Sequence, residues 1–327
     1  MDATVPAPAR AALAERAVLS RYLHRFGPVA WAHASPGSRT WHYWWHAHLV
    51  HVLADTERRA PDRRRRAVLA AVVRGVGLRT GLTWITPYYD DIAWMGLALD
   101  AAGGHRWPRR RIARRLARAV DPRTGVLPWR VGSTLFNAPA NAPGGLVLVA
   151  HGRRDAAERF AEWMASVLHD DDTGLVRDGR EDGRVRPDLW TYNQGAVIGL
   201  ELALSDENPL GAAHEDRARA LVRAVDAWCA PQDGLFPAAG GGDGGLFAGI
   251  LARYLAEAAV RVSGPEGATA RRLVERNADA IWATAVDGLF SADPRRPARP
   301  EGDDLDLSVQ LGAWITLEAA AAIAPRP

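Results

Sequence analysis

A short phrase recurs along this chain of 327 residues, about once for every pair of helical segments. It reads DPRTGVL at Asp121, DDTGLV at Asp171, and DGLF at both Asp233 and Asp287. Measured from Asp121, Asp172, Asp233 and Asp287, the spacings are 51, 61 and 54 residues. Aspartate, threonine and glycine favour a tight turn with a positive φ, and the apolar residue that follows can return to the core. A fixed phrase at this period indicates an internally repeated pair of helices.

The segments between these phrases have helical periodicity, and alternating strand patterns are scarce. One helix face carries, at i, i+3, i+4, i+7 and i+8, the residues Trp41, Trp44, Trp45, His48 and Leu49. Breaking the chain at clusters of glycine, proline and aspartate predicts about a dozen helices. They centre near residues 10–25, 40–57, 62–79, 90–102, 108–119, 139–151, 153–169, 191–204, 212–229, 244–261, 267–284 and 304–323.

Six such pairs predict an all-α fold, an (α/α)6 barrel, rather than an open array of repeats. An open array needs a polar terminal repeat to cover its last hydrophobic face. Here the last segment, residues 304–323, is as apolar as any other. No linker is long or polar enough to divide the chain, so we expect one domain over residues 1–327.

Composition excludes several classes of function. All 41 basic residues are arginine, which removes Schiff-base chemistry, pyridoxal phosphate attachment and a phosphate-binding P-loop. Cys229 is the only cysteine, so an intramolecular disulfide and a thiolate metal cluster are both impossible. The net charge is only +3, and arginine runs such as residues 63–66 and 109–115 are typical of solvated helix faces. We therefore expect no nucleic-acid partner.

The same reasoning gives expectations about location and assembly. No apolar run reaches the roughly 18–20 residues of a membrane span. The N-terminal stretch is interrupted by arginine and has no apolar signal-peptide core. We expect a cytoplasmic, monomeric protein that has no membrane partner and needs no cofactor.

Two adjacent acids, Asp90 and Asp91, follow two tyrosines in TPYYDDIAWMGLAL, residues 86–99. One aspartate is readily explained as a helix cap, which accepts backbone N–H bonds and suits the helix dipole. Two are harder to explain beside Tyr88, Tyr89 and Trp94, because like charges near a low-dielectric surface raise at least one pKa. Cleavage of a glycosidic bond requires one ionised and one protonated carboxyl group. The spacing alone leaves both interpretations open.

Further polar groups stand at the starts of predicted helices. They occur in LWTYNQGAVIGLELAL, residues 189–204, and in STLFNAPANAPGG, residues 133–145, and they are either caps or ligands for sugar hydroxyls. In an αα barrel the loops before the inner helices gather at one end, so these groups should converge with Asp90 in one cleft. The residues expected to bind substrate are Tyr88, Tyr89, Trp44, His48, Trp94, Asn137, Asn141, Trp190, Tyr192, Asn193, Gln194, Asp243 and Phe247.

Four histidines lie in the run WHYWWHAHLVH, residues 41–51. His42 and His46 have the H-x3-H spacing that places two ligands on one helix face. No nearby carboxylate completes a metal site, and the flanking tryptophans favour the wall of a sugar-binding groove, so no metal is expected. A pair of facing histidines is also the acid and base of αα-barrel sugar epimerases, and His42, His46 and His48 keep that alternative open.

Several of these stretches, in this order, resemble the motif set of glycoside hydrolase family 76, the endo-α-1,6-mannanase family related to fungal cell-wall transglycosidases. They are YYDDIAWMGLAL, STLFNAPANAPGG, GLVRDG…WTYNQGAVIG and GGLFAGILARYLA. The segment YWWHAHLVHVLAD also resembles the early helix of the family, so the similarity spans roughly residues 40–320.

The resemblance implies hydrolysis of α-1,6-mannosidic linkages with retention, through a covalent glycosyl-enzyme, on α-mannan or manno-oligosaccharides. By motif match Asp90 is the nucleophile and Asp91 the general acid/base. Retention needs carboxyl groups about 5–5.5 Å apart, against about 6.5–9.5 Å for inversion. Sequence neighbours have Cα atoms about 3.8 Å apart, which agrees with the shorter separation. The alternatives are a sugar epimerase or isomerase, a transglycosidase, and a non-hydrolytic glycan-binding relative.

Overall fold

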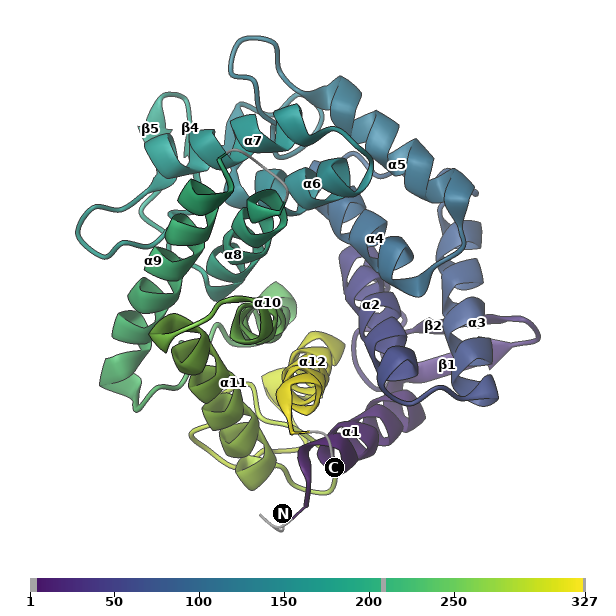
Figure 1. Cartoon of the computed structure of the whole chain (residues 1–327). Helices are drawn as coiled ribbons and strands as arrows, with labels where there is room; N and C mark the ends of the chain where they lie inside the picture. Colours follow the sequence, from purple (N-terminus) through teal and green to yellow (C-terminus); the bar gives the residue numbers. More distant parts are fainter. Residues whose placement is uncertain (1–4, 207–209, 326–327) are drawn as a thin grey trace.

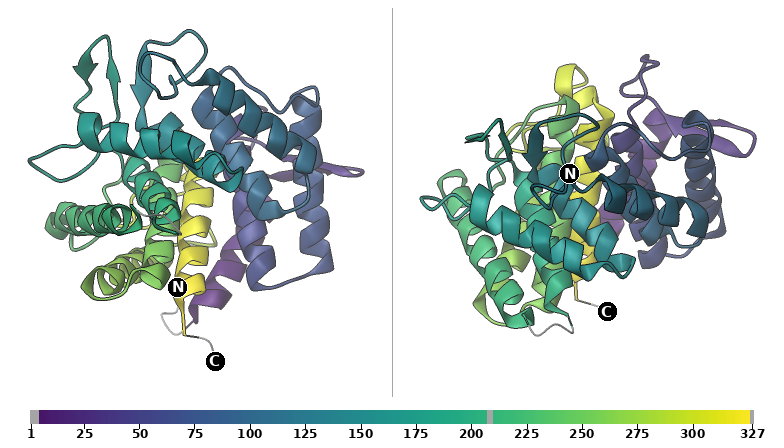
Figure 2. Two further views of the ribbon diagram at one scale, coloured as in Figure 1. Left: turned by 45° about the horizontal axis from the view of Figure 1, so that its top comes forward. Right: turned by 90° about the horizontal axis from the view of Figure 1, so that it is seen from above.

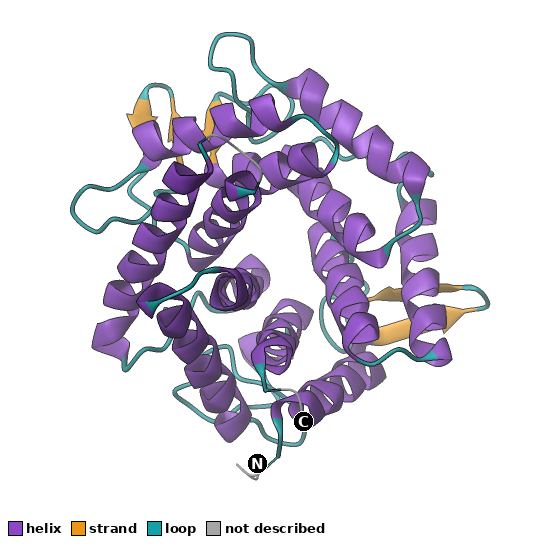
Figure 3. Cartoon of the chain, in the orientation of Figure 1, coloured by secondary structure: helices purple, strands orange, loops and turns teal. Residues whose placement is uncertain are grey.

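The computed structural model describes residues 5–206 and 210–325. Within these ranges twelve α-helices form two concentric rings (Figure 1; Figure 3). The inner helices are α2 (Tyr43–Arg59), α4 (Tyr89–Ala102), α6 (Ala138–Ala150), α8 (Thr191–Ser205), α10 (Phe247–Arg261) and α12 (Leu307–Ile323). The outer helices are α1 (Ala7–Tyr22), α3 (Arg63–Arg79), α5 (Arg106–Ala119), α7 (Arg154–Trp163), α9 (Gly211–Cys229) and α11 (Pro265–Thr284). Each inner helix packs on the next, and α12 packs on α2, which closes the ring. The predicted (α/α)6 barrel is confirmed.

The two rings differ in how apolar their helices are. Inner helix α12 is buried at every position from Leu307 to Ala321 and is apolar around its circumference, as a helix enclosed by others must be. Outer helix α5 has only a narrow buried stripe, which includes Ile112 and Leu116, and arginines cover its other faces. Among the described residues, no helix combines the length and the apolarity needed to cross a membrane.

Glycines let neighbouring inner helices approach closely. A Cβ atom on Gly195 of α8 would lie 2.7 Å from the Cα atom of Leu251 on α10. A Cβ atom on Gly249 of α10 would lie 2.8 Å from the Cα atom of Gly312 on α12. Both separations are shorter than real carbon–carbon contacts, so any larger residue would force the helices apart. The glycines of the predicted helix 191–204 therefore serve helix packing.

The recurring phrase forms the turn that leads back into the inner ring. Its glycines adopt positive φ angles, for example +74° at Gly125 and +71° at Gly174. Asp121 Oδ1 accepts the N–H groups of Arg123 and Thr124, as the expected Asx turn requires. In the second repeat the equivalent acid is Asp170, not Asp172 as the sequence spacing assumed, because the main chain of Asp170 bonds to Leu175 and Gly174.

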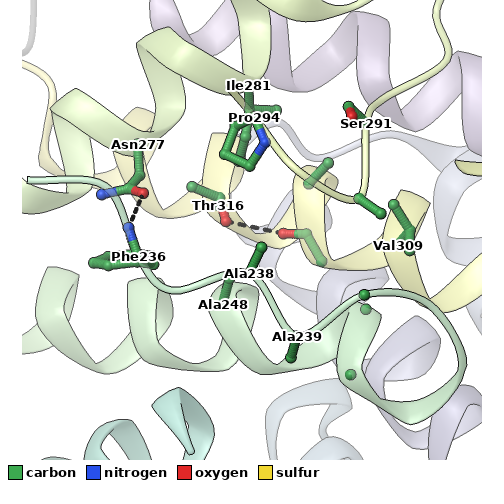
Figure 4. Close-up of a pocket in the computed structure, with 16 residues that line it drawn as sticks. Phe236, Ala238, Ala239, Ala248, Asn277, Ile281, Ser291, Pro294, Val309 and Thr316 are labelled. Atoms are coloured by element: carbon green, nitrogen blue, oxygen red, sulfur yellow. Dashed lines mark hydrogen bonds between the residues drawn. The ribbon is translucent and has the colours of Figure 1, made fainter. Parts of the chain in front are cut away.

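A buried amide side chain holds each of these turns in place. It accepts the N–H group of the apolar residue in the phrase and donates to a main-chain carbonyl of the same turn. The four pairs are Asn141 with Leu127, Gln194 with Val176, Asn277 with Phe236, and Gln310 with Phe290. Figure 4 shows the third of them, in which Asn277 comes from the outer helix α11. These contacts fix the loops that rise above one end of the barrel.

Short strands and non-α turns add to this frame and were not predicted. Strands β1 (Leu23–Phe26) and β2 (Val29–Ala32) form a hairpin beside α3, and β3 (Leu135–Asn137), β4 (Gly179–Glu181) and β5 (Arg184–Val185) form a three-stranded antiparallel sheet. The second sheet stands above the open end of the barrel (Figure 2, left). Helix α7 ends in a π-turn at Met164–Leu168, and 3-10 turns at Gly242–Leu246 and Gly302–Leu305 precede α10 and α12.

Candidate active site

A cleft of about 680 Å³ opens at the end of the barrel where the inner helices begin. Its walls come from the first turns of α2, α4, α8 and α10 and from the loops that precede the inner helices. It is lined by His42, Trp44, Tyr88, Asp90, Asp91, Trp94, Trp129, Leu135, Asn137, Asp178, Arg186, Trp190, Tyr192, Ala239, Asp243, Gly244 and Phe247. The structure thus brings together most of the residues that the sequence assigned to one cleft.

Asp90 and Asp91 lie in the first turn of α4, and the N-cap position is held by Tyr88, so neither aspartate is the cap. Asp90 Oδ1 accepts the main-chain N–H group of Asp91 at 2.8 Å. Asp90 Oδ2 accepts the indole N–H group of Trp129 at 2.9 Å. Asp91 Oδ2 has a single, long contact with the hydroxyl group of Thr86 at 3.4 Å. The two carboxyl groups therefore differ in how well their charged forms are stabilised.

The surroundings separate the protonation states of the two acids. Burial raises the pKa of Asp90 to about 6, although the N–H donors from Asp91 and Trp129 oppose the rise. Burial, then the charge of Asp90, then that of Asp243 raise the pKa of Asp91 to about 8. Near neutral pH Asp90 is ionised and Asp91 carries a proton. This is the division of roles that an acid and a nucleophile, or an acid and a base, require.

Asp243 is a third carboxylate of the cleft and lies on the 3-10 turn before α10. Its Oδ1 atom accepts the indole N–H groups of Trp44 at 2.7 Å and of Trp45 at 2.8 Å. The glycines around it let the main chain approach the loop before α12, where Gly241 N–H bonds to Asp303 at 3.0 Å. Asp243 is therefore held rigidly, and its charge acts on both Asp90 and Asp91.

Aromatic rings form two walls of the cleft. Tyr192 and Phe247 stack with centroids 4.0 Å apart, and Trp190 meets Phe247 edge-on at 5.6 Å. On the other side Tyr88 packs edge-on against Trp129 at 5.1 Å. Flat apolar rings beside polar groups are suited to a ligand that has apolar faces and a polar rim, such as a sugar ring.

Two further polar groups face the cleft. Oδ1 of Asn137 is buried and has no hydrogen-bond partner among the described residues, so it is free to accept a ligand hydroxyl. Asp178 accepts the side-chain N–H of Asn193 at 3.2 Å, and burial raises the pKa of Asp178. Arg186 is paired with Glu181 at 2.6 Å and closes the rim on this side.

Five residues expected to bind substrate lie behind the lining instead. Asn141 and Gln194 are fully buried, and their amide groups hydrogen-bond to the main chain of the repeated turns. Asn193 is buried and reaches the cleft only through Asp178. Tyr89 is buried with the guanidinium group of Arg115 over its ring, and His48 is buried between Trp44 and Trp94. Successive helix residues point about 100° apart, so of Tyr192, Asn193 and Gln194 only the first faces the cleft.

Trp129, Asp178, Arg186 and His42 line the cleft and were not assigned to it from the sequence. A signal for two of them does exist in the repeat. Trp129 follows Leu127 by two residues, and Asp178 follows Val176 by two residues, in each case after the residue that the buried amide holds. In both repeats this position points into the cleft.

His46 of α2 is held by hydrogen bonds to the main chain. His46 Nε2 accepts the N–H group of Ala32 at 3.0 Å, and its Nδ1 bonds to the carbonyl of His42 at 2.7 Å. Burial lowers the pKa of His46 to about 4, so it is a neutral structural residue. Within residues 5–206 and 210–325, no group of three or more histidine, cysteine, aspartate or glutamate side chains has an arrangement that could hold a metal ion.

A second cavity of about 40 Å³ lies behind the loop that carries Asp243 and adjoins the cleft at Ala239 and Gly244 (Figure 4). Small side chains line most of it. A water molecule occupies about 10–15 Å³ on this measure, so the cavity has room for a few waters but none for a sugar. This cavity is therefore too small to be a sugar-binding site.

A closed double ring of helices, with one ionised and one protonated carboxyl group between aromatic walls, is the arrangement expected of an αα-barrel glycosidase. The model of glycosyl hydrolase family 76 matches residues 8–294, and the chain belongs to this family.

Solved structures share this fold. The family 76 α-1,6-mannanase from Salegentibacter sp. HEL1_6 has a TM-score of 0.87 and 23% sequence identity, over 98% of this chain and 100% of that chain. The Lin0763 protein from Listeria innocua has a TM-score of 0.84 and 25% identity, over 97% of each chain. Dfg5 from Chaetomium thermophilum, in complex with glucosamine, has a TM-score of 0.69 and 15% identity, over 97% of this chain and 90% of that chain. A search of the curated proteins found no match.

Proposed function

We propose that this protein is a retaining glycosidase that cleaves α-1,6-mannosidic linkages in mannan-type glycans through a covalent glycosyl-enzyme. The observation that carries the proposal is the carboxyl pair in the cleft, with Asp90 ionised and Asp91 protonated near neutral pH. The linkage is supported by the Salegentibacter enzyme, an α-1,6-mannanase. Inactive variants of that enzyme, in which two adjacent aspartates are replaced, were solved with α-1,6-mannotriose and α-1,6-mannotetrose.

In the first half of the reaction the Asp90 carboxylate attacks the anomeric carbon while the bond from that carbon to the leaving oxygen breaks. Asp91 gives its proton to the leaving oxygen, so charge is balanced. The resulting ester removes the negative charge of Asp90. Because that charge is one of the causes that raise the pKa of Asp91, the pKa then falls.

In the second half Asp91 acts as a base. It takes a proton from water as the water oxygen attacks the anomeric carbon, and Asp90 departs as a carboxylate. Two displacements on the same carbon restore the original configuration. Adjacent residues of one helix turn agree with the separation of about 5–5.5 Å that this route requires, and not with the longer gap of inverting enzymes.

Substrate binding is assigned to the aromatic walls and to the polar groups between them. The Tyr192–Phe247 stack offers a flat face to a sugar ring. The free Oδ1 of Asn137 and the carboxylates of Asp178 and Asp243 accept hydrogen bonds from hydroxyl groups. A neutral polyhydroxylated ligand suits these acceptors better than an anionic one.

The alternatives are less well supported. A sugar epimerase needs two facing histidines, whereas His42 is the only histidine among the described residues that line the cleft. A transglycosidase shares the first half of the reaction and differs only in using a sugar as acceptor in place of water. A glycan-binding protein would have no need of a split pair of carboxyl groups.

The test is hydrolysis of α-1,6-linked manno-oligosaccharides, followed by NMR of the newly formed reducing end. We expect the α-anomer to form first and to mutarotate afterwards. Asp90→Asn and Asp91→Asn should each lower kcat/KM by a factor of about 10³ or more, because each removes a group that acts on the reacting atoms. Asp216→Asn, an exposed aspartate on α9, is the matched control.

Initial formation of the β-anomer would contradict retention. Turnover of another α-linked glycan but not of the α-1,6-mannan would contradict the linkage and leave the glycosidase assignment in place. Binding of the oligosaccharides without cleavage, unchanged in both aspartate variants, would favour the glycan-binding alternative.

A further inference from the structure

The two aspartates of the cleft receive unequal support from neighbouring donors. Both oxygens of Asp90 accept an N–H group, one from the main chain of Asp91 and one from the indole of Trp129. Within the part of the chain that the structure describes, the side chain of Asp91 accepts only the long contact from Thr86. N–H bonds to a carboxylate favour its ionised form and fix its orientation. Among the described residues, Trp129 is the only side chain that donates a hydrogen bond to Asp90.

The indole of Trp129 is held by contacts that do not involve Asp90. The main chain of Trp129 donates to the carbonyl of Leu135 at 2.7 Å and accepts the N–H group of Tyr89 at 2.9 Å. Tyr88 packs against one edge of the indole, and the guanidinium group of Arg130 lies 5.7 Å from its ring centroid. The loop between α5 and α6 is thus bound directly to the first turn of α4, so the donor is in place before any substrate arrives.

We propose that Trp129 is the positioning residue that makes Asp90 rather than Asp91 the nucleophile, because its indole N–H holds the Asp90 carboxylate ionised and aimed into the cleft. This inference rests on the proposed function. Without the indole donor Asp90 keeps the main-chain N–H bond from Asp91 but loses its side-chain donor, so the difference between the two acids becomes smaller. The main-chain N–H of Asp91 supplies one donor to Asp90, and the indole of Trp129 supplies the second.

The other charged groups of the cleft do not supply this difference. Asp243 raises the pKa of both aspartates, so it does not distinguish them. The guanidinium group of Arg186 is engaged elsewhere, since it pairs with Glu181, and the ring of His42 stacks on Trp45 with centroids 4.1 Å apart. The remaining ionisable groups that face the cleft are Asp178, Tyr88 and Tyr192.

The same hydrogen bond bears on the second half of the reaction. When Asp90 departs from the anomeric carbon, negative charge returns to its carboxyl group, and the Trp129 N–H stabilises that charge as it develops. Loss of the donor should slow this step more than the first one. We therefore expect kcat to fall more than kcat/KM, with an accompanying fall in KM as the glycosyl-enzyme accumulates.

The test is the variant Trp129→Phe, which keeps an aromatic ring against Tyr88 and removes only the N–H donor. In the profile of kcat/KM against pH we expect the acid limb to move up by about one unit, since a hydrogen bond to a charged group is worth about that much. The basic limb, which Asp91 sets, should move little. Trp107→Phe, in an exposed tryptophan of α5, is the control and should leave both limbs in place.

A second measurement does not depend on turnover or on the variant folding. In the wild-type protein with isotope-labelled tryptophan, the indole N–H resonance of Trp129 should titrate together with the carboxyl carbon of Asp90. Asp90→Asn should abolish that titration. The inference is overturned if the acid limb is unchanged in folded Trp129→Phe. It is also overturned if the indole N–H resonance of Trp129 does not titrate together with Asp90. If α-1,6-mannan is not cleaved but the indole resonance follows Asp90, the proposed substrate fails, whereas the hydrogen bond by which Trp129 orients Asp90 stands.

Discussion

Gln194 forms two hydrogen bonds with the main chain of Val176: its Oε1 accepts the N–H group of Val176 at 2.8 Å, and its Nε2 donates to the carbonyl of the same residue at 2.8 Å. The pair joins the first turn of inner helix α8 to the loop that carries Asp178 into the cleft. A side chain that satisfies both main-chain groups of one buried residue acts as a piece of secondary structure.

Replacement of this amide should destabilise the fold. Gln194→Leu keeps the size of the side chain but leaves two buried main-chain groups without partners, at about 1–3 kcal/mol for each. We expect the free energy of unfolding to fall by about 2–6 kcal/mol, measured by denaturant titration. Gln232→Leu is the matched control, because the described residues offer its side chain no hydrogen bond and it is only partly buried. Equal stability of the two variants would show that water molecules replace the two hydrogen bonds that Gln194 makes to Val176.

The hydrogen bonds between Gln194 and Val176 also illustrate what could be predicted from the sequence and what could not. The helices and their pairing follow from apolar periodicity and from the repeated turn, which are local properties. The use made of a polar residue at a helix start is not local. Asn141 and Gln194 are as polar as Asn137, yet the first two are spent on the turns of the repeat and only the third has an atom left for a ligand.

The direction in which each side chain leaves its helix turn explains why some expected residues line the cleft and others do not. Asp90 and Asp91 both line the cleft, because both point out of the first turn of α4 toward it. Tyr88 and Tyr89 show the converse, since Tyr88 lines the cleft and Tyr89 is buried against α5. The repeat indicates that Trp129 points into the cleft, but its place beside Asp90 depends on the pairing of its loop with the first turn of α4, a contact between residues 40 positions apart.

The raised pKa of Asp91 has a consequence for stability. Its folded-state pKa, about 8, lies above the value of about 3.9 in an unfolded chain. The folded protein therefore binds more protons between these two values, and its stability falls as the pH rises through that range. Asp91→Asn removes the carboxyl group that causes this fall in stability. We expect the variant to be more stable than the wild type by about 1–2 kcal/mol near pH 8.5, and to differ little near pH 4.

Thermal unfolding at the two pH values, with Asp216→Asn as control, measures this difference. The exposed control should show no gain at either pH. A variant that is less stable than the wild type at high pH would mean that the Asp91 carboxylate is stabilised by contacts beyond Thr86, and would contradict the assignment of Asp91 as the protonated member of the pair.

The charge of Asp243 should set the pH at which the pair works. With Asp90 titrating at about 6 and Asp91 at about 8, kcat/KM should follow a bell between those values. Asp243→Asn keeps an oxygen that can accept the indole N–H groups of Trp44 and Trp45 but removes a negative charge that raises both pKa values. Both limbs should therefore move to lower pH, by about half a unit to one unit.

The direction of these shifts separates the roles of Asp243 and Trp129. Asp243→Asn lowers both limbs and keeps the width of the bell, because the lost charge acts on both aspartates. Trp129→Phe raises the acid limb alone and narrows the bell, because the lost donor acts on one of them. High salt should reduce the effect of Asp243 only slightly, since the cleft shields these charges from the solvent. If both limbs stay in place in Asp243→Asn, the charge of Asp243 does not affect the pKa values of Asp90 and Asp91. Its role would then be limited to hydrogen bonds with the ligand.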